Sequence, residues 1–166
     1  MHKEIWTIGR ILQWTEQYFQ SKEMDTPRLD GEVLLSHVLG KDRIYLYTHY
    51  DQPLIQEELD AFRPLVQRRA KGYSVASITG QKDFMGLTFK VNDKVLIPRP
   101  DTETLIEHVL DTYPENCNLR ILDVCTGPGT ILLSLLHYLP NAVGVGLDIS
   151  TDALPLAREN ADSFNL

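Results

Sequence analysis

The sequence has little cysteine and no long apolar run, and each scarcity excludes a class of protein. Its two cysteines in 166 residues, Cys117 and Cys125, fit a reducing compartment, and no His/Cys cluster has the spacing of metal ligands. No apolar run approaches the roughly 18 residues that span a membrane. The N-terminus also lacks the apolar stretch of a signal peptide. We therefore expect a cytoplasmic globular protein with no metal and no membrane partner.

An excess of positive charge is missing as well. The formal net charge is −7, and most of the acidic excess falls in residues 81–166. A free-standing nucleic-acid-binding protein usually has the opposite sign, so direct nucleic-acid binding is not expected. The one basic cluster is formed by Arg63, Arg68, Arg69 and Lys71. We interpret it as the solvated end of a helix, where cations complement the helix dipole, and a partner-binding patch is the alternative.

The spacing of apolar residues divides the sequence into parts with different periodicity. Up to residue 73, apolar residues recur at helical spacing, and Thr26-Pro27 is typical of a helix start. Pro64 lies within the helical segment 54–71 and is expected to kink or break it. Short helices with short connections predict a small helical bundle over residues 1–73.

Between residues 74 and 100 the pattern changes to that of strands. Ser74–Thr79 is β-rich, and Asn92-Asp93 separates two apolar stretches in the manner of a hairpin turn. Pro98-Arg99-Pro100 then favours an extended loop. Residues 74–100 are therefore predicted to form a β-hairpin linker.

Residues 101–166 predict the start of an α/β domain. Ile121–Val124 is a buried type of strand and Gly127-Pro128-Gly129 is a tight turn; an apolar helix and a second strand that ends at Asp148 follow. Strand–helix–strand order requires a parallel, right-handed crossover. The predicted fold class is therefore α + α/β, with a helical bundle, a hairpin linker and the first part of a Rossmann-like domain.

The glycine turn and Asp148 together indicate a cofactor that contains a nucleoside. Glycine accepts positive φ and lets a ligand approach the backbone, and an acidic residue after the second strand can accept both hydroxyls of a ribose. The dinucleotide fingerprint needs a third glycine where Leu132 stands, which disfavours a nicotinamide-dependent oxidoreductase. Asp123 beside the loop suits a cofactor with an ammonium and a sulfonium. S-adenosylmethionine fits best, and a tight turn without ligand is the alternative.

Three stretches, read together, carry a resemblance to a known family. They are the run Val95–Glu103, the loop Asp123–Gly129 and the segment Asp148–Ser150. In these stretches the chain resembles the HemK/PrmC family of protein-(glutamine-N5) methyltransferases, and parts of residues 28–40 and 67–87 resemble that family too. The run of proline, arginine, proline and acid is highly specific, whereas the glycine loop is not.

The resemblance implies an S-adenosylmethionine-dependent methyltransferase that acts in translation termination. Family members methylate the side-chain amide nitrogen of the glutamine in the Gly-Gly-Gln motif of peptide chain release factors, which their helical domain, here residues 1–73, helps to recognise. Residues 101–166 would form an incomplete N-terminal part of the methyltransferase domain. The implied cofactor-binding residues are Asp123, Cys125, Thr126, Gly127, Pro128, Gly129, Asp148 and Ile149. The implied pocket-lining residues are Pro98, Arg99, Pro100, Asp101 and Glu103, and a rigid linker that caps a helix is the alternative for this run.

One absence bears on activity. The Asn-Pro-Pro-Tyr motif that orients the amide in the family does not occur in the 166 residues, so no catalytic residue is assigned and an inactive fragment is expected. Cys125 stands where most members carry glycine, and Pro128 removes a backbone N–H. A ribosomal protein glutamine methyltransferase and a non-catalytic release-factor-binding module are the alternatives. A short parallel sheet would also expose an edge through which copies of the chain can associate.

Overall fold

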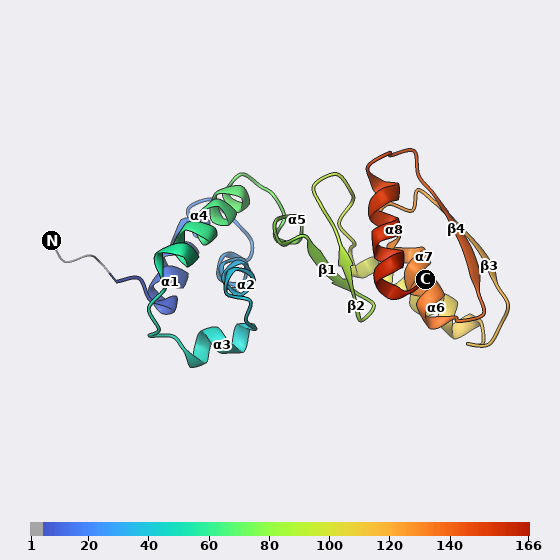
Figure 1. The fold of residues 1–166 in the computed structure, drawn as a ribbon, viewed down its shortest axis with the longest axis horizontal. Helices are drawn as coiled ribbons and strands as arrows, with labels where there is room; N and C mark the ends of the chain where they lie inside the picture. Colours follow the sequence, from blue (N-terminus) through green and yellow to red (C-terminus); the bar gives the residue numbers. More distant parts are fainter. Residues whose placement is uncertain (1–4) are drawn as a thin grey trace. The chain divides into compact units, whose positions relative to one another are not determined.

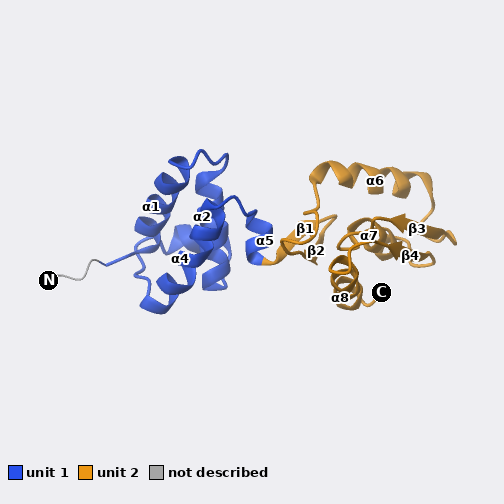
Figure 2. Ribbon diagram, turned by 90° about the horizontal axis from the view of Figure 1, so that it is seen from above, with its two compact units in different colours: residues 1–79 blue, residues 80–166 orange. Residues whose placement is uncertain are grey.

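The chain consists of a helical unit and a mixed unit. The computed structural model describes residues 5–166 and divides into residues 1–79 and 80–166 (Figure 2). The first unit holds α1 (Ile8–Gln20), α2 (Pro27–Leu39), α3 (Arg43–Thr48), α4 (Gln56–Ala70) and α5 (Val75–Thr79) (Figure 1). The second holds β1 (Gln81–Phe84), β2 (Leu87–Lys90), η1 (Pro100–Thr102), α6 (Glu103–Thr112), β3 (Arg120–Val124), α7 (Thr130–Tyr138), β4 (Val143–Leu147) and α8 (Ala153–Phe164).

The helical unit is built around one apolar core. Its fully buried members come from α1, α2 and α3 and are Ile8, Leu12, Phe19, Leu34, Leu35 and Leu46. Thr7 caps α1, because its Oγ1 accepts a hydrogen bond from the Arg10 amide at 3.3 Å. Gly40 ends α2 in the left-handed region, at a φ of 60°. Thr26 precedes α2, but its hydroxyl donates to Asp30 Oδ1 rather than capping the helix.

Helix α4 runs unbroken through Pro64. The predicted break is wrong, and packing explains why: Phe62 and Val66, on either side of the proline, are buried in the core. Pro64 itself is exposed, and so is Asp60, the residue whose carbonyl loses its helical partner. The predicted solvated helix end is also wrong for Arg69, whose Nε lies 2.7 Å from Oδ2 of the buried Asp30.

A buried carboxylate ties α2 to α3. Only 1% of the Glu32 side chain is exposed, and it accepts hydrogen bonds from Arg28 Nε at 2.6 Å, from Arg43 and from the Tyr47 hydroxyl. Burial opposes the charge, but the hydrogen bonds from Tyr47, Arg28 and Arg43 outweigh it and hold the pKa of Glu32 below its ordinary value. The charged form is therefore part of the folded state.

Ser74–Thr79 is not a strand. Residues Val75–Thr79 form α5, and the Ser74 hydroxyl accepts a hydrogen bond from the Ser77 amide at 3.0 Å at the start of the helix. Val75 and Ile78 lie one helical turn apart, and both pack on the core of the helical unit. The strand prediction failed because packing on the core, at the helical spacing of Val75 and Ile78, outweighed the strand preference of β-branched residues.

The hairpin exists, but its turn lies elsewhere than predicted. Strands β1 and β2 pair antiparallel across Met85 and Gly86, whose φ angles are 49° and 71°. Two positive φ angles define the tight turn that matches the twist of a hairpin. Asn92 instead makes a local turn, with Oδ1 accepting from the Lys94 amide at 2.9 Å. The prediction overlooked a methionine in the left-handed region, which is held there by contacts from outside the hairpin.

Strands β3 and β4 pair in parallel through α7, as the sequence predicted. Helix α7 covers one face: a Cβ on Gly144 would lie 2.4 Å from Leu132 Cδ1, so a larger residue there would displace the Leu132 side chain. The other face is apolar and at least half exposed in the part of the chain that the structure describes. It carries Leu122, Val124, Val143, Val145 and Leu147.

Candidate cofactor site

The loop from β3 to α7 is shaped by three residues in the left-handed region. Gly127 and Gly129 have φ angles of 57° and 84°, so the predicted need for glycine is confirmed at both positions. Cys125 also lies there, at a φ of 67°, which the sequence did not predict. A Cβ on Gly129 would lie 2.8 Å from the Leu133 side chain, whereas one on Gly127 would meet nothing within 4 Å. The space beside Gly127 is therefore open to a ligand.

Asp148 follows β4 and holds the loop between β3 and α7 in place by hydrogen bonding. Its Oδ2 accepts a hydrogen bond from the Gly127 amide and its Oδ1 accepts one from the Ser150 amide, both at 2.8 Å. These backbone donors, Ser150 first, hold the pKa of Asp148 below its ordinary value. Each carboxylate oxygen has two lone pairs, so one on each oxygen stays free for a hydroxyl donor.

Asp123 lies at the corresponding end of β3. Its Oδ2 accepts a hydrogen bond from the Thr126 hydroxyl at 2.8 Å. Thr126 is buried and packs against Gly146 of β4, and its amide donates to the Leu147 carbonyl at 2.9 Å. Two carboxylates thus flank the loop at the carboxyl ends of neighbouring parallel strands. Such a site favours a cationic ligand over a phosphate.

Asn160 of α8 supports the loop, and the sequence reading missed it. Its fully buried side chain donates from Nδ2 to the Pro128 carbonyl at 2.8 Å and to the Lys90 carbonyl at 3.0 Å. Its Oδ1 accepts from the Lys90 amide at 2.8 Å. The signal was a lone asparagine on the same helical face as the buried Ala153 and Leu156. Pro128, which has no N–H to offer a ligand, still contributes its carbonyl to this clamp.

The predicted pocket-lining run is anchored to the hairpin. Glu103 Oε1 accepts a hydrogen bond from the Met85 amide at 2.8 Å, and the Tyr138 hydroxyl donates to the Met85 carbonyl at 2.6 Å. These two contacts fix the methionine in its left-handed conformation. Pro98 is buried, whereas Arg99, Pro100 and Asp101 are exposed. Among the described residues, no hydrogen bond joins this run to the loop of residues 125–129.

Ile149 is 98% exposed directly after Asp148, where it can pack against a ligand.

The described residues contain no group of three or more His, Cys, Asp or Glu side chains that could hold a metal ion. No helix among them is long and apolar enough to cross a membrane.

The chain is similar to known proteins over almost all of its length. Residues 10–80 match the family described as the PrmC N-terminal domain. The chain is 45% identical over 159 residues to the release factor glutamine methyltransferase of Geobacter sulfurreducens, covering 96% of this chain and 55% of the relative. Identity to the enzymes of the same name is 40% in Chlorobaculum tepidum (99% and 58% covered) and 38% in Rhodopirellula baltica (97% and 56% covered). The chain therefore spans about half the length of the curated relatives it matches.

Proposed function

We propose that this chain, whose residues 10–80 match the PrmC N-terminal domain and which is similar to release factor glutamine methyltransferases, contributes the S-adenosylmethionine site for methylation of a release factor glutamine. The acceptor would be the side-chain amide nitrogen of the glutamine in the Gly-Gly-Gln motif. The names of the relatives support a release factor glutamine as the acceptor, and the family resemblance implies the amide nitrogen and the motif. The observation that carries the cofactor assignment is the Asp148 carboxylate, which is held by the Gly127 amide beside the open glycine loop.

In this proposal each residue of the loop has a separate task. Asp148 accepts the two ribose hydroxyls, as an acidic residue at the end of the second strand does in related sheets. Asp123 attracts the ammonium of the cofactor, and the backbone of Cys125–Gly129 lies against its polar groups. The run Pro98–Glu103 would line the pocket. Bound S-adenosylmethionine supplies a methyl group on a sulfonium, and the protein's part is to hold and orient it.

Transfer to an amide nitrogen needs more than a bound cofactor. The nitrogen lone pair is delocalised into the carbonyl, so the acceptor must be aligned with the methyl group and its N–H groups must find acceptors. The Asn-Pro-Pro-Tyr motif expected to do this is absent from the 166 residues. We therefore propose that residues 1–73 serve substrate recognition and residues 101–166 the cofactor. By themselves these residues transfer no methyl group.

A non-catalytic binding module is the second candidate. The observation that favours it is the apolar core of the helical unit, whose members all lie between Ile8 and Ile78. A unit with its own core can bind a partner without the cofactor site. Binding of a release factor by a chain that shows no affinity for S-adenosylmethionine would favour this second reading.

Isothermal titration with S-adenosylmethionine tests the first proposal. We expect weak but measurable binding that Asp148→Ala lowers by at least about tenfold, or ~1.4 kcal/mol. Asp152→Ala is the matched control, because Asp152 is also an acidic residue near the start of α8 but pairs with the exposed Lys94. Equal affinities of the wild type and Asp148→Ala, or no binding by either, would contradict the cofactor assignment.

A further inference from the structure

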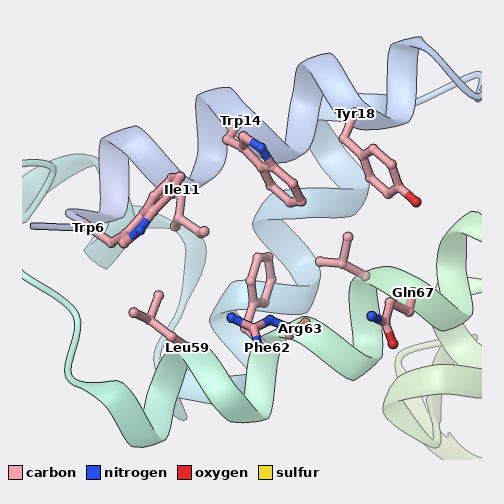
Figure 3. Close-up of a pocket in the computed structure, with 9 residues that line it drawn as sticks. Trp6, Ile11, Trp14, Tyr18, Leu59, Phe62, Arg63 and Gln67 are labelled. Atoms are coloured by element: carbon pink, nitrogen blue, oxygen red, sulfur yellow. The ribbon is translucent and has the colours of Figure 1, made fainter. Parts of the chain in front are cut away.

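The helical unit has an aromatic groove that the proposed cofactor site does not use. Figure 3 shows Trp6, Trp14 and Tyr18 facing Leu59, Phe62 and Arg63 of α4 across it. Its volume is about 390 Å³. Helices α1 and α4 both pack on α2, which leaves the groove between them. We call this site the aromatic groove.

One wall of the aromatic groove is a row of ordered rings. Trp6 and Trp14 meet edge to face with 6.4 Å between ring centroids, and Trp14 stacks on Tyr18 at 5.3 Å. Such contacts hold the rings in place, so little side-chain entropy is lost when a ligand covers them. Trp14 is nevertheless 46% exposed, whereas Phe62 in the floor is 2% exposed. Half-exposed tryptophan over an apolar floor is the composition of a binding hot spot.

Among the residues that line the aromatic groove, the charged one is the cation Arg63. None of its lining residues is acidic. Arg63 is exposed on the α4 side and forms no ion pair with another described residue. The Lys22 ammonium lies 5.8 Å from the Tyr18 ring, so a second cation lies at that end of the aromatic row. A complementary ligand therefore has an apolar face and carries carboxylates.

We propose that the aromatic groove docks an amphipathic segment of a partner protein, with apolar side chains inserted between α1 and α4 and Asp or Glu residues beside Arg63. A helix laid into an apolar groove is a recurrent mode of peptide recognition. The proposal goes beyond the proposed function, because it holds whether or not the partner is a methyl acceptor. It also does not depend on the loop at Asp148.

The chain offers an internal reporter for this site. It contains two tryptophans, and both line the aromatic groove. All tryptophan emission therefore originates there, and a ligand that covers the rings changes the emission. The probe is a set of peptides selected from a random display library on the whole chain and then synthesised. We expect the selected peptides to share apolar residues at helical spacing together with Asp or Glu, and to shift the emission to shorter wavelength.

Substitutions test whether the peptides bind in the aromatic groove or on another surface. Arg63→Glu should lower the affinity for the acidic peptides by about tenfold, and Trp14→Ala by at least as much. Lys41→Glu makes the same change of charge outside the groove and should leave the affinity unchanged. Thermal unfolding of each variant checks that the helical unit is intact. The proposal would be overturned if the selection gave no binders or if the selected peptides lacked acidic residues. It would also be overturned if neither Arg63→Glu nor Trp14→Ala changed the affinity.

Discussion

The backbone of Cys125 is in a strained conformation that its side chain does not require. An L-residue in the left-handed region costs roughly 1–2 kcal/mol relative to its favoured conformations, and glycine avoids this penalty. With φ at 67°, Cys125→Gly is expected to raise the free energy of unfolding by about 0.5–1 kcal/mol, after allowance for the greater entropy of unfolded glycine. Urea unfolding followed by circular dichroism measures the change. Cys117→Gly, where φ is not positive, should not stabilise, and a destabilised Cys125→Gly would contradict the strain.

Glu32 makes stability depend on pH in a defined direction. Its folded-state pKa is lowered, so its contribution is present above the unfolded pKa and is lost as the pH falls through the folded pKa. Glu32→Gln should cost about 2–3 kcal/mol near pH 7, because Arg28 and Arg43 lose the buried carboxylate. The gap between wild type and variant should narrow as the pH is lowered below the ordinary range of glutamate. Unfolding curves at several pH values check this, and a gap that widens in acid would refute it.

At the residue scale, the sequence predicts what local geometry demands. Gly127 and Gly129 were predicted because a tight strand-to-helix turn needs positive φ, and Asp148 because it follows a strand. Asn160 was out of reach, since its hydrogen-bond partners Lys90 and Pro128 lie 70 and 32 residues away. A contact of that kind depends on how α8 packs, which no local pattern encodes.

At the element scale, the packing of helices and strands depends on long-range contacts such as those of Asn160. Asn160 joins α8 to the end of β2 and to the glycine loop, so Asn160→Ala would leave the Lys90 and Pro128 groups without partners. We expect a loss of about 2–3 kcal/mol in the unfolding of the second unit, and weaker binding of S-adenosylmethionine. Thermal unfolding and calorimetry give the two readouts. Asn116→Ala serves as the control, because no hydrogen bond of the described residues uses that side chain. Equal losses of unfolding free energy in both variants would contradict the special role of Asn160.

The three errors at the element scale, of which the unbroken helix α4 at Pro64 is one, share one cause. Val75–Thr79 became a helix and the hairpin turn moved to Met85-Gly86, in each case because packing against other elements outweighed local preference. The parallel pair β3–β4 and the crossover helix α7 were predicted correctly, since alternation of strand, turn and helix constrains topology strongly.

At the scale of the whole molecule, the helical unit should fold by itself. Its core is drawn entirely from residues 8–78, and the division of the chain falls after Thr79. A protein of residues 1–79 is therefore expected to keep a helical circular-dichroism spectrum and to unfold cooperatively on heating. A disordered spectrum for that protein would show that the unit depends on residues 80–166. The second unit differs, because it exposes the apolar face of β3 and β4.

The measurement that bears most directly on the cofactor site is a titration of the isotopically labelled chain with S-adenosylmethionine, followed by the backbone amide resonances. If the cofactor lies beside the loop, the Gly127 and Ser150 amides, which donate to Asp148, shift together with Ile149. The indole resonances of Trp6 and Trp14 should stay in place, because the aromatic groove belongs to the helical unit. Shifts confined to other residues, or none at Gly127 and Ser150 at saturating cofactor, would contradict an S-adenosylmethionine site at Asp148.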